Sequence, residues 1–178
     1  MSDNSTVAVA PFSGDDIGAE DDPARTMAML QALFSQVLRG TTPWRVAKCL
    51  LTLRDEVNAM APSRKKDADG TIGDAAHQTK ASDHNPWVHD GSMGVVTALD
   101  ITHDPANGCD CKTLSDALNQ SRDPRIKYVI WNRQIFSATV APWMWRPYTG
   151  ISPHTEHVHV SVVSDQAHYD DATPWSLT

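Results

Sequence analysis

The stretch "HTEHVHVSVV", residues 154–163, carries the strongest strand signal in the chain, and the fold is best read outward from it. A period of two divides its side chains into an apolar set and a polar set, Val158, Val160 and Val162 against His157, His159 and Ser161. One face is therefore suited to a hydrophobic core and the other to polar chemistry. Two neighbouring imidazoles on one face are costly to bury without partners, and they commonly meet a metal ion, a carboxylate or each other. Taken alone, the pattern fits a solvated face with incidental histidines equally well.

A second strand signal, "GVVTALDIT" at residues 94–102, supplies the partner that the histidines need. Alternation places Val96, Ala98 and Asp100 on one face, so we expect the Asp100 carboxylate on the polar side of the sheet. A lone buried carboxylate is expensive there, and a metal ion removes that cost. His84 lies in the loop "SDHNP", where a turn at Asn85-Pro86 fixes its approach. The sequence thus predicts a site of His84, Asp100 and His159 with one position open for water, as in catalytic zinc sites.

The remaining signals predict an α+β domain. One helix is expected over 23–39, capped by Asp22 and ended at Gly40, and a second from Pro43, capped by Thr42, to a point before Pro62. Further along, "CKTLSDALNQSRDP" predicts a helix, and "IKYVIWNRQIF" predicts a strand whose Asn132-Arg133 forms a tight turn into another. Helices followed by strands indicate an antiparallel sheet with helices packed on one side rather than a doubly wound fold.

Length and composition favour one domain. The 178 residues are 40% hydrophobic, enough for a single core. We expect a flexible leader over 1–22 and a single catalytic domain over 23–178, with its core at 43–165 and the helix 23–39 as an appendage. The net charge of −7 argues against nucleic-acid binding. The three cysteines are an odd number with unusual spacing, so we expect reduced thiols rather than a cysteine-based zinc site.

The N-terminal sequence shows no basic region followed by an apolar run, so neither a secretory signal nor a membrane anchor is predicted. The other histidines have weaker expectations. His154 is a candidate substrate contact or a loop residue, and His103 a candidate cap or neighbour of the site. The sequence also suggests that His77 lines the site and that His89 is exposed. Tryptophans are expected in the core, with "PWMWRPY" at residues 142–148 the best candidate for a cleft wall.

These residues resemble the zinc peptidases grouped with lysostaphin, the D-Ala-D-Ala metallopeptidases and the hedgehog domain, and within them the D-Ala-D-Ala carboxypeptidase-like enzymes of bacteria and phage endolysins. The resemblance rests on a two-part motif: Ser82-Asp83-His84, Gly94 and Ala98-Leu99-Asp100, then Glu156-His157-Val158-His159. "DGTIGDAAH" and "YVIWNRQI" also look like stretches of phage-encoded members. The resemblance covers roughly residues 50–163 and is moderately specific.

The resemblance implies a hedgehog-like or DD-peptidase-like fold and a Zn²⁺ ion held by His84, Asp100 and His159. It implies Glu156 as general base, His157 as the group that stabilises the oxyanion, and Ser82 near the substrate. An ideal strand turns Glu156 away from His159, so its role requires the strand to begin after it. The loop between His84 and Asp100 is longer than the family's usual spacing, so either His84 is displaced or the loop bulges outward, over the cleft.

By this resemblance the chain is a zinc metallopeptidase that hydrolyses a peptide bond of bacterial peptidoglycan, in the stem peptide or the cross-link. We expect it to be made in the host cytoplasm, without a signal peptide, and to act on the cell wall after release as an endolysin or as part of a virion docked through residues 1–40. One alternative is a non-catalytic metal-binding structural module of a virion. Another is a two-histidine phosphoesterase, which needs a second His-x-Ser/Thr motif that the sequence does not clearly offer.

Overall fold

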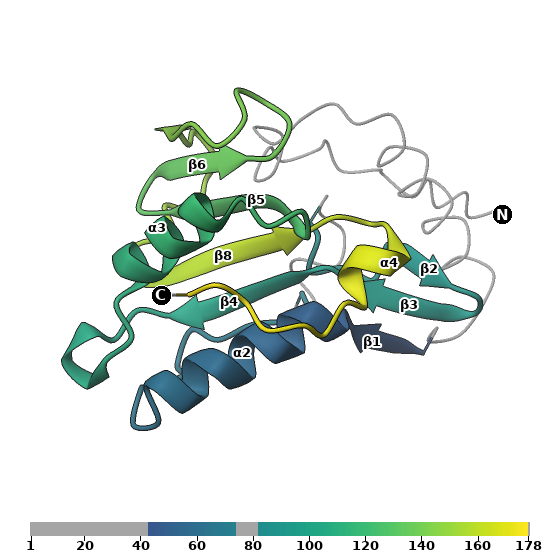
Figure 1. Ribbon diagram of the computed structural model, residues 1–178, viewed down its shortest axis with the longest axis horizontal. Helices are drawn as coiled ribbons and strands as arrows, with labels where there is room; N and C mark the ends of the chain where they lie inside the picture. Colours follow the sequence, from purple (N-terminus) through teal and green to yellow (C-terminus); the bar gives the residue numbers. More distant parts are fainter. Residues whose placement is uncertain (1–42, 74–81, 178) are drawn as a thin grey trace, which may run out of the picture.

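The computed structural model describes residues 43–73 and 82–177 (Figure 1). Its elements in chain order are β1 (Trp44–Val46), α2 (Lys48–Met60), β2 (Val88–Asp90), β3 (Met93–Val96), β4 (Ala98–Thr102), the 3-10 turn η1 (Pro105–Asn107), α3 (Cys111–Ser121), β5 (Ile126–Trp131), β6 (Gln134–Ser137), β7 (Arg146–Pro147), β8 (His157–Val162) and α4 (Gln166–Tyr169). The leader and helix predicted over 1–39, and His77, lie outside the described residues.

The main sheet has the strand order β4-β8-β5-β6-β7, and every neighbouring pair in it is antiparallel. The histidine-rich stretch at residues 154–163 contains β8, which lies between β4 and β5. The turn expected at Asn132-Arg133 joins β5 to β6, with positive φ angles of 45° and 60° at its two residues. Positive φ at both central positions is the geometry of the two-residue hairpin turn that matches strand twist. The α+β class and the antiparallel main sheet are therefore confirmed.

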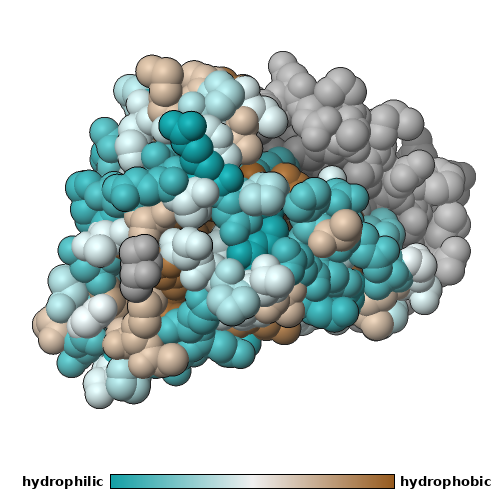
Figure 2. All heavy atoms as spheres, viewed as in Figure 1, coloured by the Kyte–Doolittle hydropathy of each residue, from teal (hydrophilic) through white to brown (hydrophobic). Residues whose placement is uncertain are grey.

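The two faces of the main sheet differ in chemistry. The three valines of β8 lie in the large hydrophobic cluster with side chains of α2 and α3, among them Leu50, Leu53, Leu114 and Leu118. Both helices lie on the same side of the sheet in Figure 1. Seen from that side, the surface is mainly hydrophilic, with hydrophobic residues visible only in small areas (Figure 2). The helices thus cover the apolar face, and the histidines of β8 project from the other.

The start of the second predicted helix was wrong. Residues 44–46 form β1, which pairs in parallel with β3, and α2 begins only at Lys48. The Gly94 N–H donates to the Pro43 carbonyl oxygen at 2.8 Å, so the backbone at Pro43 is used by strand pairing rather than by a helix. Arg45, on this strand, also pairs with Asp170 at the far end of the chain. These long-range contacts outweigh the local preference for a helix start.

The strand predicted over 94–102 divides into two. β3 belongs to a three-stranded sheet with β1 and β2, whereas β4 belongs to the main sheet. The break falls at Thr97, whose N–H donates to the Asp83 carbonyl oxygen at 3.1 Å. Val96 therefore does not share a sheet face with Asp100, as a continuous strand would require. Asp100 itself lies in β4 as predicted.

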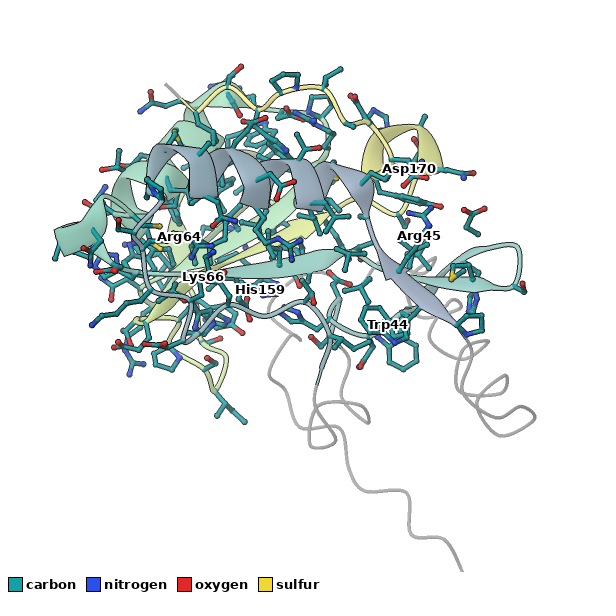
Figure 3. The ribbon with its side chains drawn as sticks, turned by 90° about the horizontal axis from the view of Figure 1, so that it is seen from below. Trp44, Arg45, Arg64, Lys66, His159 and Asp170 are labelled. Atoms are coloured by element: carbon teal, nitrogen blue, oxygen red, sulfur yellow. The ribbon has the colours of Figure 1, made fainter. Side chains whose placement is uncertain are left out.

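The core extends beyond residue 165, where the sequence placed its end. Tyr169 and Trp175 are 2% and 5% exposed and belong to the large hydrophobic cluster. The guanidinium of Arg45 donates to both carboxylate oxygens of Asp170 at 2.7 and 2.8 Å, and the two residues lie together in Figure 3. Arg125 stacks over the Trp175 ring at 3.9 Å. The C-terminal segment is therefore part of the fold.

Within the described ranges, no helix combines the length and the apolar character needed to cross a membrane. The cysteines are free and buried, as the prediction of reduced thiols requires.

Candidate metal centre

Three polar side chains from distant parts of the chain meet on the face of the main sheet that the helices leave open. The Nε2 atom of His84 lies 3.1 Å from Nδ1 of His159 and 3.2 Å from Oδ2 of Asp100, and Nδ1 of His159 lies 3.0 Å from Oδ1 of Asp100. Ligands on a tetrahedral zinc ion at its usual bond lengths stand about 3.3 Å apart. The spacing of the three ligand atoms therefore suits one divalent ion.

Strand pairing fixes the positions of two of these side chains. Asp100 of β4 and His159 of β8 are direct partners across the antiparallel pair, so their side chains lie side by side on one face. His159 is 3% exposed and lies within the molecule in Figure 3. The sheet register thus fixes the carboxylate and one imidazole without any help from loops.

A turn holds His84, the third side chain. The Asn85 N–H donates to the Ser82 carbonyl oxygen, and the indole N–H of Trp87 donates to the same oxygen at 2.7 Å. The extra residues after His84 form the β2–β3 hairpin, which pairs with β1. The long loop is therefore absorbed into a separate sheet, and His84 remains beside Asp100.

Within that hairpin, Gly94 is required by close packing. A Cβ atom at Gly94 would lie 2.7 Å from the Cβ of Pro86 and 3.1 Å from its carbonyl oxygen. Only a residue without a side chain allows the hairpin to approach the turn that carries His84.

The segment 69–73 forms a wall beside the site. Gly70 exchanges backbone hydrogen bonds with Asp100, and a Cβ on Gly70 would lie 3.2 Å from Oδ2 of Asp100. The Thr71 carbonyl oxygen lies 3.0 Å from Nδ1 of His84. A carbonyl can only accept, so Nδ1 of His84 carries the proton and Nε2 faces the site. Part of "DGTIGDAAH", one of the stretches noted in the sequence, thus orients a predicted ligand.

A buried chain of hydrogen bonds fixes the tautomer of His159. Asp83 forms an ion pair with Lys127 at 3.2 Å, and its Oδ2 accepts the hydroxyl proton of Ser161 at 2.9 Å. Since Ser161 gives its single proton to Asp83, its oxygen must accept from Nε2–H of His159 at 3.0 Å. Nδ1 of His159 is then left as a lone pair that faces Asp100 and His84. Such outer hydrogen bonds commonly orient metal-binding histidines.

Three lone-pair donors therefore face one another, namely Nε2 of His84, Nδ1 of His159 and the carboxylate of Asp100. No hydrogen atom lies between the carboxylate and His159. Burial raises the pKa of Asp100, but the positive charge of a protonated His84 beside it outweighs burial and holds that pKa well below its usual value. The carboxylate is thus kept ionised in a largely enclosed place. A cation at the centre, either a proton on His84 or a metal ion, is needed to balance this arrangement.

A bulge in β5 brings Lys127 into the chain of contacts. Ile126 pairs with Val162 and Tyr128 with Ser161, so Lys127 is an extra residue between them. A bulge changes the direction of one side chain without shifting the rest of the strand. Here it lets Ile126 remain in the core, while Lys127 reaches Asp83 from the other side.

His157 and His154 lie at the edge of the metal centre. Nε2 of His157 is 3.8 Å from Oδ2 of Asp100, and burial lowers its pKa despite the opposing charge of Asp100. His154 is 8% exposed, and its ring contacts those of Tyr148, His157 and His159. Burial is the largest cause that lowers the pKa of His154, to about 3. Both rings are therefore neutral at pH 7, and His154 is more than a loop residue.

Glu156 and Ser82 have less direct contacts. The strand begins at His157, so Glu156 is not bound by the alternation of β8, and its side chain is exposed. Burial lowers the pKa of His157, and the charge of Glu156 offsets a small part of that effect. The Ser82 hydroxyl accepts from the His84 N–H at 3.3 Å, which makes Ser82 part of the turn that carries the ligand.

The structure also shows where the other histidines and the tryptophans named in the sequence predictions lie. Nδ1 of His103 accepts from the Cys111 N–H at 3.1 Å and so caps α3, and His89 is exposed as predicted. Trp143 and Trp145 pack on the large hydrophobic cluster rather than lining a cleft.

Asp83, Ser161 and Lys127 were not predicted to contribute to the site. Ser161 shares a face with His159 by alternation, and Asp83 precedes His84 in the motif, so the sequence contained a signal for both as hydrogen-bonding partners of the site. It contained no such signal for Lys127, because a bulge leaves no mark in the sequence.

Comparison with known proteins adds no family. No family model matches the chain, and no curated protein or solved structure matches it either.

Proposed function

We propose that this chain is a zinc-dependent hydrolase that cleaves a peptide bond of bacterial peptidoglycan. The observation that carries the proposal is the convergence of Nε2 of His84, Nδ1 of His159 and the Asp100 carboxylate on one point. Three protein ligands of this kind leave a fourth position for water, which is the arrangement of catalytic rather than structural zinc. The resemblance of the two-part motif to zinc peptidases of cell walls supports the substrate class.

A zinc ion held here would polarise a carbonyl and lower the pKa of a water molecule at the open position. The chain's own groups then have separate tasks. Asp100 and the two imidazoles would hold the ion, and the Asp83–Ser161 pair keeps His159 in the tautomer that can bind it. Glu156, immediately before β8, would take a proton from water and return it to the leaving amine. His157, neutral and half-buried beside Asp100, donates to the oxygen on which charge develops.

The test combines metal analysis with a digest of purified peptidoglycan. We expect one zinc per chain and soluble peptides, identified by mass spectrometry, whose new termini show which bond is cut. His159→Ala should lose both metal and activity, whereas Glu156→Gln should keep the metal and lose turnover. His168→Ala is the matched control, because His168 lies near the C-terminus and pairs with Asp165, three residues before it. A metal-free wild type that still releases peptides overturns the proposal, and so does a fully active Glu156→Gln.

The exposed position of Glu156 favours a second candidate, a non-catalytic metal-binding structural module of a virion. That reading predicts one metal ion per chain but no soluble peptides from peptidoglycan. It also predicts that Glu156→Gln has the same melting temperature and metal affinity as the wild type. The proposal that residues 1–40 attach the chain to a virion is tested separately, by whether the protein copurifies with phage particles.

A further inference from the structure

A row of directly paired residues runs across the main sheet from the metal centre to its far edge. The pairs are Asp100 with His159, His159 with Ile130, Ile130 with Ile135, and Ile135 with Arg146. Direct partners in antiparallel strands project from the same face. Arg146 therefore stands on the face that carries the metal centre. Three strand spacings separate it from His159, about 14 Å between Cα atoms.

An apolar floor lies between the two positions. Tyr128, Ile130, Ile135 and Tyr148 form a second hydrophobic cluster, separate from the large one under the helices. On the opposite face, Trp145 packs edge-on against Phe136 with ring centroids 4.8 Å apart. The segment "WRPY" thus alternates, with its tryptophan in the core and its arginine on the site face. A binding surface with an apolar floor and one charged group at its end suits a peptide with an anionic substituent.

The guanidinium of Arg146 has unused donors. Its Nε and Nη2 atoms are buried and have no hydrogen-bond partner among the residues that the structure describes. By contrast, three other arginines that are buried or half-buried each pair with an aspartate: Arg45 with Asp170, Arg64 with Asp69, and Arg125 with Asp123. Buried donors without acceptors are rare in folded proteins and call for a specific explanation.

The two unused donors form one edge of the guanidinium plane. Nε–H and the adjacent Nη2–H point in parallel, and this edge matches the two oxygens of a carboxylate. A carboxylate accepts from both donors and also pairs the charge, whereas a water molecule leaves the charge unpaired. The unpaired edge, its place on the site face and the apolar floor together indicate a ligand with a carboxylate.

We propose that Arg146 is a specificity-determining residue that binds a free carboxylate of the peptide substrate. The inference rests on the proposed function and deepens it. An extended peptide advances at most about 3.6 Å per residue, so about four residues span the distance from the metal centre to Arg146, and the carboxylate lies about that far along the peptide from the bond that is cut. In the conformation described, the edge is covered, so binding includes a turn of the half-buried arginine side chain toward the substrate. The new ion pair offsets the packing that the side chain gives up when it turns.

The experiment follows the Arg146 Nε–H signal by ¹H–¹⁵N NMR in the full chain, assigned by its absence from Arg146→Lys. The probes are a synthetic stem pentapeptide ending in D-Ala–D-Ala with free carboxylates and the same peptide with every carboxylate converted to an amide. We expect the free-acid peptide to shift the signal and the amide to leave it unchanged. Arg146→Gln should weaken binding of the free acid about tenfold or more and that of the amide by less than about threefold. Arg54→Gln, which removes one charge from α2, is the matched control.

Equal shifts with both peptides, or with neither, overturn the proposal. A shift of the same size with acetate or inorganic phosphate at equal concentration also overturns it, because it shows general anion binding only. The measurement is made on metal-free protein as well, so it does not depend on turnover. If peptidoglycan is not cut but the free acid still shifts the signal selectively, the proposed peptidase activity fails and the carboxylate site stands. If peptidoglycan is cut and the signal does not move, the reverse holds.

Discussion

Replacing Ser161 with alanine removes the link that sets the tautomer of His159. In the wild type, Ser161 accepts from Nε2–H of His159 and donates to Asp83. Without the hydroxyl, a proton on Nε2 is left buried and unpaired, at a cost of about 1–3 kcal/mol. The proton is better placed on Nδ1, where it can donate to Asp100 Oδ1 at 3.0 Å. That tautomer has no lone pair left for a metal ion in the site.

The expected loss of zinc affinity is 10- to 100-fold, about 1.4–2.7 kcal/mol, as for other outer partners of metal-binding histidines. Calorimetric titration against a chelator of known affinity measures the loss. Long-range ¹H–¹⁵N NMR of the metal-free protein reports the tautomer, with Nε2–H expected in the wild type and Nδ1–H in Ser161→Ala.

Ser115→Ala is the control, since Ser115 is also fully buried but donates to the Lys112 carbonyl oxygen within α3. Its zinc affinity should stay within about threefold of the wild type, the margin allowed for a purely structural effect. If Ser161→Ala keeps wild-type affinity and the Nε2–H tautomer, the argument from hydrogen bonding is refuted.

Three further outcomes follow from the structure. Gly94→Ala should destabilise the fold by about 1–3 kcal/mol in urea denaturation, because the added methyl meets Pro86; unchanged stability would contradict that close approach. Burial raises the pKa of Asp69, but paired hydrogen bonds from Arg64 hold it below its usual value. The stability contributed by Asp69 is therefore present above pH 4 and is lost as the pH falls through the lowered pKa, and Asp69→Asn should flatten the acid limb of a melting-temperature profile. Asp100→Asn should abolish zinc binding, and retention of one tightly bound zinc ion per chain would reject the ligand set.

The sequence predicted the elements whose signals are local. Alternation placed β8 and its polar face, and the stretch "CKTLSDALNQSRDP" predicted α3. The three ligand atoms were also foreseen, because a carboxylate and two imidazoles on polar positions need one another once they are buried.

The sequence by itself determined which side chains could share a metal ion, because period and residue type are properties of the chain alone. Tertiary structure decided the rest. It turned residues 44–46 into a strand, because β3 offered a partner that no local pattern reveals. It extended the core to Trp175, and it used a bulge at Lys127 to reach Asp83. It also placed Arg146 in the row of His159, since strand register across a sheet depends on pairing between distant segments and leaves no trace within either one.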